Sequence, residues 1–359
     1  MEENKELLVI GAGGTGGHIY AGLSIAQKWK TERGEVLFVG SSYGMEKKLI
    51  KDFPLETLNI SPFKGKGLRG MLALFQVALS ILKVISLFLR KKPSVVLGIG
   101  GYASFPVCFS AWIMRIPFAI MEQNTIPGLT NKILSRISNL CFTGFESSRR
   151  YLRSKKIICS GNPVRKEVKD FPYQPVRNRA DYPTIIVLGG SQGARFLNEL
   201  MPEVFKNLLN CGITPKVIHQ TGKTDMEYVE RRYKELGIKA EVFDFNPHIH
   251  TFLAKAHLAV CRAGALTIAE LSIAGVPAIF IPYPYAVYNH QFTNAKEVEN
   301  IGGGVCVEQK DATPSKISEI IRELIESKKV FEMSRKMKEF SKSDADEVII
   351  AGLRSLIKC

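Results

Sequence analysis

Two glycine-rich turns, each directly after a short apolar segment, constrain the fold of this chain more than any other feature. The first turn, GAGGTGG (11–17), follows the apolar residues 7–10, and the second, GGSQGA (189–194), follows the apolar and β-branched residues 184–188. An apolar strand that runs through a glycine-rich turn into a helix is the opening of a nucleotide-binding βαβ unit. Because the pattern occurs once in each half of the 359-residue chain, we predict two similar α/β domains in tandem.

Short apolar segments alternate with stretches of helical spacing along the rest of the chain. This alternation indicates βαβ units and parallel sheets. The predicted strands are residues 7–10, 36–40, 95–99, 118–121, 140–143, 184–188, 216–219, 240–243, 258–261 and 278–281, and the predicted C-terminal helices are residues 314–326, 330–342 and 345–357.

The domain boundary is expected where the alternation restarts. A chain of this length exceeds the roughly 100–200 residues of one domain, so we predict a first domain at 1–163 and a second at 164–342. Their join is expected near 161–163 or in the polar, proline-containing stretch 171–183. The helix at about 343–359 either stays on the second domain or packs back on the first. One large doubly wound sheet is the alternative architecture.

Positive charge is concentrated in the first half. The chain has 49 Lys and Arg against 34 Asp and Glu, and residues 1–163 hold 22 of the bases but only 10 of the acids. No acid occurs between Glu56 and Glu122, and this window contains the apolar stretch 71–89 with basic residues on both flanks. Polar residues at three- and four-residue steps along that stretch predict an amphipathic helix at an anionic membrane surface, or else a buried helix with a solvated polar stripe. The stripe consists of Gln76, Ser80, Lys83, Ser86 and Arg90. Nucleic acid is not an expected partner, because the basic window lacks interleaved aromatics and a recognised binding motif.

The spacing of cysteine, histidine and aspartate residues does not predict a metal site. The seven cysteines are widely spaced and contain no CxxC, so neither a disulfide framework nor a zinc site is predicted. The pair His248 and His250 has no evident third ligand, and Asp344 and Asp346 fall in the C-terminal helical region. We therefore expect no metal and no cofactor.

The first glycine loop fits the dinucleotide pattern G-x-G-x-x-G, but the acid that accompanies it is missing. In NAD-binding folds an acid at the end of the second strand binds the ribose. Here residues 36–40 are followed by Ser41 and Ser42. NAD is therefore disfavoured and NADP remains open, while glycines that only permit a tight turn are the structural alternative.

Two loops of the second half carry groups suited to a sugar nucleotide. Residues 261–267 open a helix with small side chains, so its N-terminal amides are accessible to an anion. Glu270, in the first turns, is suited to accept hydrogen bonds from ribose hydroxyls, or it only complements the helix dipole. The polar, aromatic loop 282–295 contains His290, Gln291 and Asn294, which are suited to read sugar hydroxyls.

Seven motifs occur in order along the chain: GAGGTGGH (11–18), GIGGYASFP (98–106), EQNTIPGLTNK (122–132), GNPVR (161–165), GGSQGA (189–194), RAGALTIAEL (262–271) and HQxxNA (290–295). Together they resemble the MurG family of UDP-N-acetylglucosamine:N-acetylmuramyl-(pentapeptide)-pyrophosphoryl-undecaprenol N-acetylglucosaminyltransferases. The resemblance runs from residue 8 to about 304. It implies two Rossmann-like domains facing across a cleft, the glycosyltransferase B fold, with the donor in the C-terminal domain and the membrane-bound acceptor at the N-terminal one.

Binding roles follow from this resemblance motif by motif. For the first half, it implies that Thr15, Gly16 and Gly17 lie near the donor and the acceptor diphosphate and that Asn124 meets the donor sugar. For the donor diphosphate, it implies contacts from Arg165 and Ser191, and helix N-terminal groups placed on the α-phosphate by Ala265, Leu266 and Thr267. It also implies that Glu270 holds the ribose, that Gln291 reads the N-acetylglucosamine hydroxyls, and that the uracil contact falls near Phe245 or Asn246. The segment DFNPHIH (244–250) departs from the family's acid-rich version.

The implied reaction is one inverting displacement without a metal. The 4-hydroxyl of the muramyl sugar of undecaprenyl-pyrophosphoryl-MurNAc-pentapeptide attacks UDP-GlcNAc, which converts lipid I to lipid II. His18 is the candidate general base, because the ordinary pKa of histidine is about 6.5, and Glu122 is its competitor. A helix-capping or loop-orienting His18 is the structural alternative.

The implied location is the cytoplasmic face of the cell membrane. A related glycolipid glycosyltransferase, an NADP-dependent oxidoreductase and a non-catalytic nucleotide-sugar sensor remain alternatives.

Overall fold

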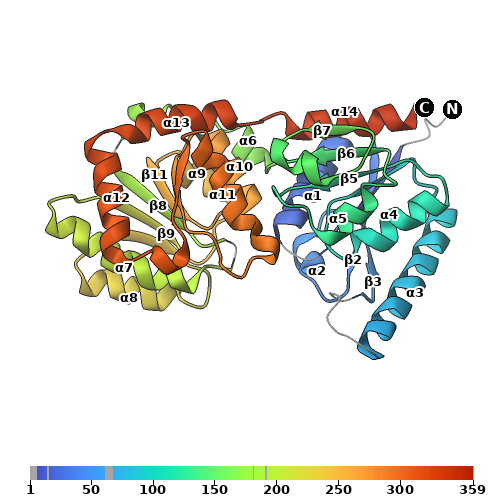
Figure 1. The fold of residues 1–359 in the computed structure, drawn as a ribbon, viewed down its shortest axis with the longest axis horizontal. Helices are drawn as coiled ribbons and strands as arrows, with labels where there is room; N and C mark the ends of the chain where they lie inside the picture. The colour runs from blue at the N-terminus through green and yellow to red at the C-terminus, as the bar shows by residue number, and fades with distance from the viewer. Residues whose placement is uncertain (1–5, 14–15, 61–67, 181, 191, 359) are drawn as a thin grey trace. The chain divides into compact units, whose positions relative to one another are not determined.

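The chain forms two compact units, shown in a computed structural model (Figure 1). Unit 1 comprises Met1–Arg165 and Lys342–Cys359, and unit 2 comprises Lys166–Ser341. The structure describes residues 6–13, 16–60, 68–180, 182–190 and 192–358, with side chains omitted for 68–73. The two units are described separately below.

Unit 1 is built on a seven-stranded parallel sheet of order β3-β2-β1-β4-β5-β6-β7. Central strands of such a sheet are covered on both faces, which explains why most of them are continuous apolar runs. The strands are β1 Leu7–Gly11, β2 Glu35–Ser41, β3 Leu55–Leu58, β4 Val95–Gly98, β5 Phe118–Glu122, β6 Leu140–Thr143 and β7 Ile157–Cys159.

Two apolar clusters cover the two faces of this sheet. Alternate residues of β1 enter different clusters, with Leu8 and Ile10 in one and Val9 in the other. The first cluster takes side chains from α1 and α14, and the second from α3 and α4. The helices of unit 1 are α1 Gly16–Thr31, α2 Glu46–Leu49, α3 Leu68–Lys91, α4 Ser104–Ile113, α5 Leu129–Leu134 and α14 Ala345–Ile357, with a 3₁₀ turn η1 at Glu146–Tyr151.

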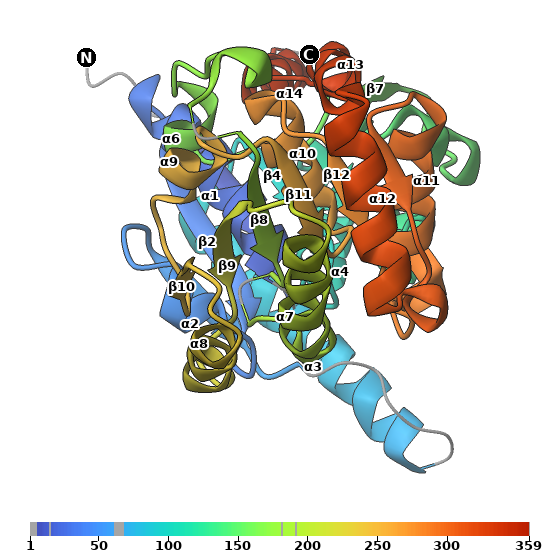
Figure 2. The same cartoon turned by 90° about the vertical axis from the view of Figure 1, so that its left-hand side faces the viewer.

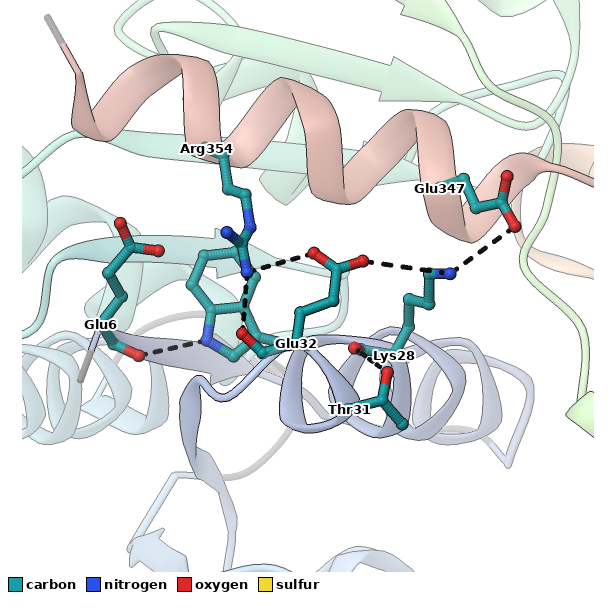
Figure 3. A network of polar contacts seen from close by, with 7 residues as sticks. Glu6, Lys28, Thr31, Glu32, Glu347 and Arg354 are labelled. Carbon is teal, nitrogen blue, oxygen red and sulfur yellow. Dashed lines mark hydrogen bonds and ion pairs between the residues drawn. The ribbon is translucent and has the colours of Figure 1, made fainter. Parts of the chain in front are cut away.

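The last helix of the chain packs on the first domain, beside α1. Ile349, Ile350 and Leu353 of α14 are buried in the cluster beneath α1. A polar network links the two helices at their surface (Figure 3): the Arg354 guanidinium lies 3.1 Å from a Glu32 carboxylate oxygen and 5.3 Å from the centre of the Trp29 ring. The chain therefore returns to unit 1 after completing unit 2.

Unit 2 contains a six-stranded parallel sheet of order β10-β9-β8-β11-β12-β13. Side chains of α7, α8 and α12 bury the face that carries Ile185 and Val187, and α7 packs against α12 (Figure 2). The strands are β8 Thr184–Leu188, β9 Lys216–Gln220, β10 Ala240–Phe243, β11 Leu258–Cys261, β12 Ala278–Phe280 and β13 Gly304–Cys306. The helices are α6 Lys166–Lys169, α7 Arg195–Asn210, α8 Met226–Glu235, α9 Ile249–Leu253, α10 Ala265–Ala274, α11 His290–Asn300, α12 Pro314–Glu326 and α13 Lys329–Phe340, with 3₁₀ turns η2 Val176–Asn178, η3 Val287–Asn289 and η4 Gln309–Asp311.

The presence of two separate sheets confirms the two-domain α/β prediction and excludes one continuous doubly wound sheet. Every predicted strand forms within a residue or two of its expected bounds, whereas β3, β7 and β13 were not predicted. Helix α3 differs from its predicted polar stripe at Ser80. That residue is 5% exposed, and its hydroxyl donates to the Gln76 carbonyl instead of facing solvent. In the part of the chain that the structure describes, no helix combines the length and apolarity needed to cross a bilayer.

Candidate functional site

In unit 1, the first glycine loop packs directly on the backbone of the loop after β4. A Cβ at Gly101, where φ is +75°, would overlap the Gly13 carbonyl, and a Cβ at Gly13 would lie 2.8 Å from that of Ala103. The Ser104 hydroxyl is 2.6 Å from the carbonyl oxygens of both Gly11 and Gly100. The glycines are therefore needed because two backbones meet here without room for side chains.

His18, in the first turn of α1, lies against the loop after β4. A Cβ at Gly100, where φ is +91°, would be 3.1 Å from His18 Nε2 and 3.6 Å from Gln123 Oε1. The Gln123 amide donates to the Ile99 carbonyl at 2.9 Å, which fixes its orientation. The imidazole, the glycine turn after β4 and the loop after β5 thus come together at the carboxyl edge of the sheet.

Glu122, the last residue of β5, is only 3% exposed and supports the loop that follows it. One carboxylate oxygen accepts from the Asn124 backbone N–H at 2.9 Å, and the other from Asn131 Nδ2 at 2.8 Å and the Gly128 N–H at 3.2 Å. Burial raises the pKa of this carboxyl, and these N–H donors oppose the rise. Both oxygens are therefore used to shape residues 124–131, including the predicted sugar contact Asn124.

The predicted residues Gly16, Gly17 and Arg165 lie on or against α1. Gly16 and Gly17 form its first turn, whereas Thr15 lies outside the described residues. The guanidinium of Arg165 lies 5.5 Å from the centre of the Tyr20 ring, and the Ser24 hydroxyl donates to the Val164 carbonyl at 2.7 Å. The GNPVR segment is thereby held on α1.

In unit 2, the parallel register brings the predicted donor loops to one edge. Leu188 pairs with Gln220 on one side and with Cys261 on the other, and Cys261 pairs with Phe280. Loops that carry ligands in open α/β sheets leave from this carboxyl edge. The loops that follow contain Ser191, Asn246, Ala265, Leu266, Thr267, Glu270 and Gln291, of which Ser191 lies outside the described residues.

Helix α10 starts with uncharged residues, of which Leu266 and Thr267 are partly exposed. Gly264 is its N-cap, and no acid occurs in its first turn, Ala265–Thr267. Asn294 of α11 is fully buried and donates to the Ala263 carbonyl at 3.2 Å, so the turn before the helix is anchored. Glu270 is half-buried in the second turn. The ten-residue helix therefore presents a positive N-terminal end at the sheet edge.

Gln291 holds the aromatic loop that precedes it. Its Oε1 accepts from the Tyr283 N–H at 2.9 Å. Tyr288 and Asn289 both have a φ of +53°, an unusual conformation for residues other than glycine. The Asn246 side chain, in the loop after β10, accepts from the His248 N–H at 2.8 Å and closes a turn.

Arg262 is a charged residue of this edge that the sequence alone did not single out. It is 9% exposed, and its guanidinium donates to the carbonyls of Ile281 and Pro282 and to the side chain of Gln309. Burial lowers its pKa to about 10, which still leaves it charged at neutral pH. A lone arginine directly after a buried strand was the available signal.

The candidate metal residues are not gathered into a site. The rings of His248 and His250 are 5.8 Å apart and edge to face. Across the described part of the chain, no group of three or more His, Cys, Asp or Glu side chains is arranged to hold a metal ion.

Comparison with known proteins gives one family for both units. The glycosyltransferase family 28 N-terminal domain matches residues 8–143 and the family 28 C-terminal domain matches residues 184–349. The chain is 39% identical over 322 residues to the UDP-N-acetylglucosamine–N-acetylmuramyl-(pentapeptide) pyrophosphoryl-undecaprenol N-acetylglucosamine transferase of Myxococcus xanthus, covering 88% of this chain and 84% of that protein. It is 36% identical to the Coxiella burnetii transferase of the same name, covering 97% of both. The crystal structure of Acinetobacter baumannii MurG superposes with a TM-score of 0.81 at 28% identity, over 98% of this chain and 99% of that one.

Proposed function

The chain belongs to the MurG family of glycosyltransferase family 28, and we propose that its two units divide the substrates of the family's reaction between them. The protein is an N-acetylglucosaminyltransferase of peptidoglycan biosynthesis, which transfers N-acetylglucosamine from UDP-GlcNAc to the undecaprenyl-pyrophosphoryl N-acetylmuramyl-pentapeptide. This family membership disfavours the glycolipid transferase and oxidoreductase alternatives. In the proposal, unit 2 binds UDP-GlcNAc, and unit 1 binds the lipid-linked acceptor at a membrane.

Donor binding by unit 2 is supported above all by the shared edge of its strands. The loops after β8, β11 and β12 leave from one register row, so their residues can face a single nucleotide. The N-terminal end of α10 and the buried cation of Arg262 suit the diphosphate, and Glu270 is placed one turn further for the ribose. Ser191 and Gln291 complete the proposed set of unit 2, with the diphosphate for Ser191 and the sugar hydroxyls for Gln291. Arg165, which belongs to unit 1, is proposed for the diphosphate as well.

The leaving diphosphate gains negative charge in the transition state, so fixed positive groups at the sheet edge lower the barrier. His18 takes the proton of the acceptor hydroxyl in the proposed mechanism. Glu122 is assigned a positioning role, because its carboxylate already accepts hydrogen bonds from Asn124, Gly128 and Asn131. Because both oxygens are already hydrogen-bonded, the Glu122 carboxylate is better suited to support the loop than to transfer a proton.

Membrane association is proposed for an exposed apolar surface on α3 and its neighbours. Phe75, Leu79, Leu82 and Leu89 recur at three-, four- and seven-residue steps, and between 49% and 63% of each is exposed. Helix α4 packs against both α3 and α5. We define the membrane face as the exposed apolar residues Leu74, Phe75, Leu79, Leu82 and Leu89 of α3, Trp112 and Ile113 of α4, and Leu129 and Ile133 of α5.

Exposed cations accompany these apolar side chains, and the two together suit an anionic leaflet. Both views show α3 at the margin of unit 1, with its N-terminal turns extending past the strands of that unit (Figures 1 and 2). The exposed cations of this region are Lys83, Arg90, Lys91, Lys92, Arg115 and Arg136. Docking on the cytoplasmic face would bring unit 1 to the lipid carrier of the acceptor.

The catalytic assignment is tested with a water-soluble acceptor analogue. His18→Ala should lower kcat by about 100-fold or more, as loss of a general base typically does, and should remove the acidic limb of the pH profile of kcat/KM. Glu122→Gln, the comparison variant, should lower activity because a side-chain NH₂ group would face backbone N–H donors, yet keep that limb. Loss of the limb in Glu122→Gln, with its retention in His18→Ala, would reassign the base to Glu122.

A further inference from the structure

A fully buried histidine, His219 of β9, lies beneath the donor loops of unit 2. Its Nδ1 is 2.8 Å from the Tyr233 hydroxyl and its Nε2 is 3.1 Å from Asn198 Oδ1. Tyr233 and Asn198 are themselves 2% and 1% exposed. These three polar side chains therefore form a chain of hydrogen bonds from which water is excluded.

The Asn198 amide, at one end of these hydrogen bonds, determines where their protons lie. Asn198 Nδ2 is 2.9 Å from the Thr221 carbonyl oxygen and 2.8 Å from Asp225 Oδ2, and both of these groups accept. The other atom of the amide, Oδ1, therefore faces His219 and must accept from Nε2–H. Nδ1 is then the unprotonated nitrogen, and the Tyr233 hydroxyl donates to it. Burial lowers the pKa of His219 to about 3, which agrees with a neutral ring.

The chain of hydrogen bonds ends at the backbone on which the second glycine loop rests. A Cβ at Gly193, where φ is +78°, would overlap the Thr221 carbonyl oxygen, and a Cβ at Gly222 would overlap the Gln192 carbonyl. The Gln220 side chain adds a hydrogen bond of 2.9 Å to the Gly190 carbonyl. The position of the Thr221 carbonyl thus determines where Gln192 and Gly193 can lie.

We propose that His219 is a positioning residue for the donor: its Nε2–H fixes Asn198, which holds the Thr221 carbonyl against the glycine loop that receives the diphosphate of UDP-GlcNAc. This inference rests on the proposed donor role of residues 189–194. His219 touches no substrate in this arrangement and acts only through Asn198. A neutral donor is required, since a side chain that only accepts would leave Asn198 Oδ1 facing another acceptor.

The test compares His219→Leu with His219→Gln in the full-length protein, by calorimetric titration with UDP and with UDP-GlcNAc. Leucine leaves the buried Asn198 Oδ1 unpaired, which destabilises the position of Asn198. We expect Kd for both ligands to rise about tenfold or more, and the KM for a soluble acceptor to stay within about twofold. Glutamine restores a donor at a similar reach and should recover most of the affinity.

Phe205→Leu is the matched control. The Phe205 ring packs against the Tyr233 ring in the same core, with centroids 6.1 Å apart, but Phe205 takes no part in the hydrogen bonds of His219, Tyr233 and Asn198. It should lower thermal stability by as much as His219→Leu while leaving the Kd for UDP unchanged. Wild-type affinity in a folded His219→Leu variant, or an equal loss of affinity in Phe205→Leu, would overturn the proposal.

Two parallel measurements separate this inference from the donor-loop assignment. Ser191→Ala tests the loop itself: unchanged UDP affinity there contradicts the loop assignment, whereas unchanged affinity in His219→Leu alone contradicts the positioning role. Nitrogen-15 spectra of the imidazoles at pH 7.5 test the proton assignment without any variant. A neutral His219 protonated on Nε2 supports the inference, and an Nδ1–H tautomer or a charged ring would refute it.

Discussion

Replacing Phe75 and Leu82 of α3 together by serine should release the protein from anionic membranes and leave its fold intact. Full burial of a Phe or Leu side chain contributes about 1.5–3 kcal/mol. Phe75 is 62% exposed and Leu82 is 63% exposed, so about 1–2 kcal/mol per residue remains to be gained on insertion. The pair accounts for about 2–4 kcal/mol, which corresponds to a fall of about 30- to 700-fold in the membrane partition coefficient.

The assay is sedimentation with vesicles of phosphatidylcholine alone or mixed with phosphatidylglycerol. The control variant, Tyr285→Ser with Val287→Ser, removes two apolar side chains of unit 2 that are 80% and 67% exposed. It should partition like the wild type. Equal partitioning of the α3 variant and the wild type would refute the membrane face, and an equal loss in the control would show that any exposed apolar side chain suffices.

Salt separates the apolar part of this binding from the electrostatic part. Each Lys or Arg near an anionic leaflet contributes about 1 kcal/mol, and this attraction is screened as the Debye length falls. Arg90→Gln with Lys91→Gln should therefore weaken binding by about 2 kcal/mol at low salt and much less at high salt. The serine variant should keep the salt dependence of the wild type. Activity on a soluble acceptor without the lipid tail should be unchanged in the two α3 variants.

Three further predictions concern the interior of each unit. Gly193→Ala should raise the Kd for UDP-GlcNAc about tenfold or more in calorimetric titration, because its Cβ would overlap the Thr221 carbonyl; Gly212→Ala, with the same positive φ but open space, should not change this Kd. Arg354→Met should lower the free energy of unfolding of unit 1 by about 1 kcal/mol, measured in urea by the fluorescence of the two tryptophans, which both lie in that unit. The pKa of His219 is about 3 against an ordinary value of 6.5, so the unfolded chain binds this proton first and stability is lost as pH falls below 6.5. Between pH 7 and 5 the wild type should lose about 2 kcal/mol more than His219→Gln, by circular dichroism in urea, and an identical pH dependence would show that His219 is not neutral by burial.

The fold could be predicted from the sequence wherever burial on both faces forces a continuous apolar run. Residues 184–188 and 140–143 are such runs, and both form strands with these bounds. Strand β3, Leu55–Leu58, was missed because Glu and Thr interrupt its apolar pattern at the edge of the sheet. Strands β7 and β13 have only three residues each and lie at the edges of their sheets, whereas the equally short β12 lies inside its sheet, within the apolar run 278–281.

The candidate site could be predicted only where one local segment carries the chemistry. The glycine loops were recognisable because a tight turn between strand and helix requires glycine within a few residues. The links between His219 and Asn198, 21 residues apart, and between Arg262 and Gln309, 47 residues apart, depend on how elements pack and leave no local pattern. Ser80 was wrongly predicted to face solvent. Its hydroxyl donates to the Gln76 carbonyl of its own helix, so this polar residue can occupy the buried face.

Glu122 and His219 solve the same physical problem in the two units, which bears on what their mutation can reveal. Each lies within two residues of the carboxyl end of a parallel strand, is almost fully buried, and has its hydrogen-bonding side-chain atoms paired, with at least one partner that supports the loop after the strand. Removal of either side chain should therefore lower activity even though neither needs to touch a reacting atom. A loss of kcat alone cannot identify the general base in such a site. The group that transfers the proton is the one whose loss removes a limb of the pH profile, and a supporting group is one whose loss is recovered by a side chain that restores its hydrogen bonds.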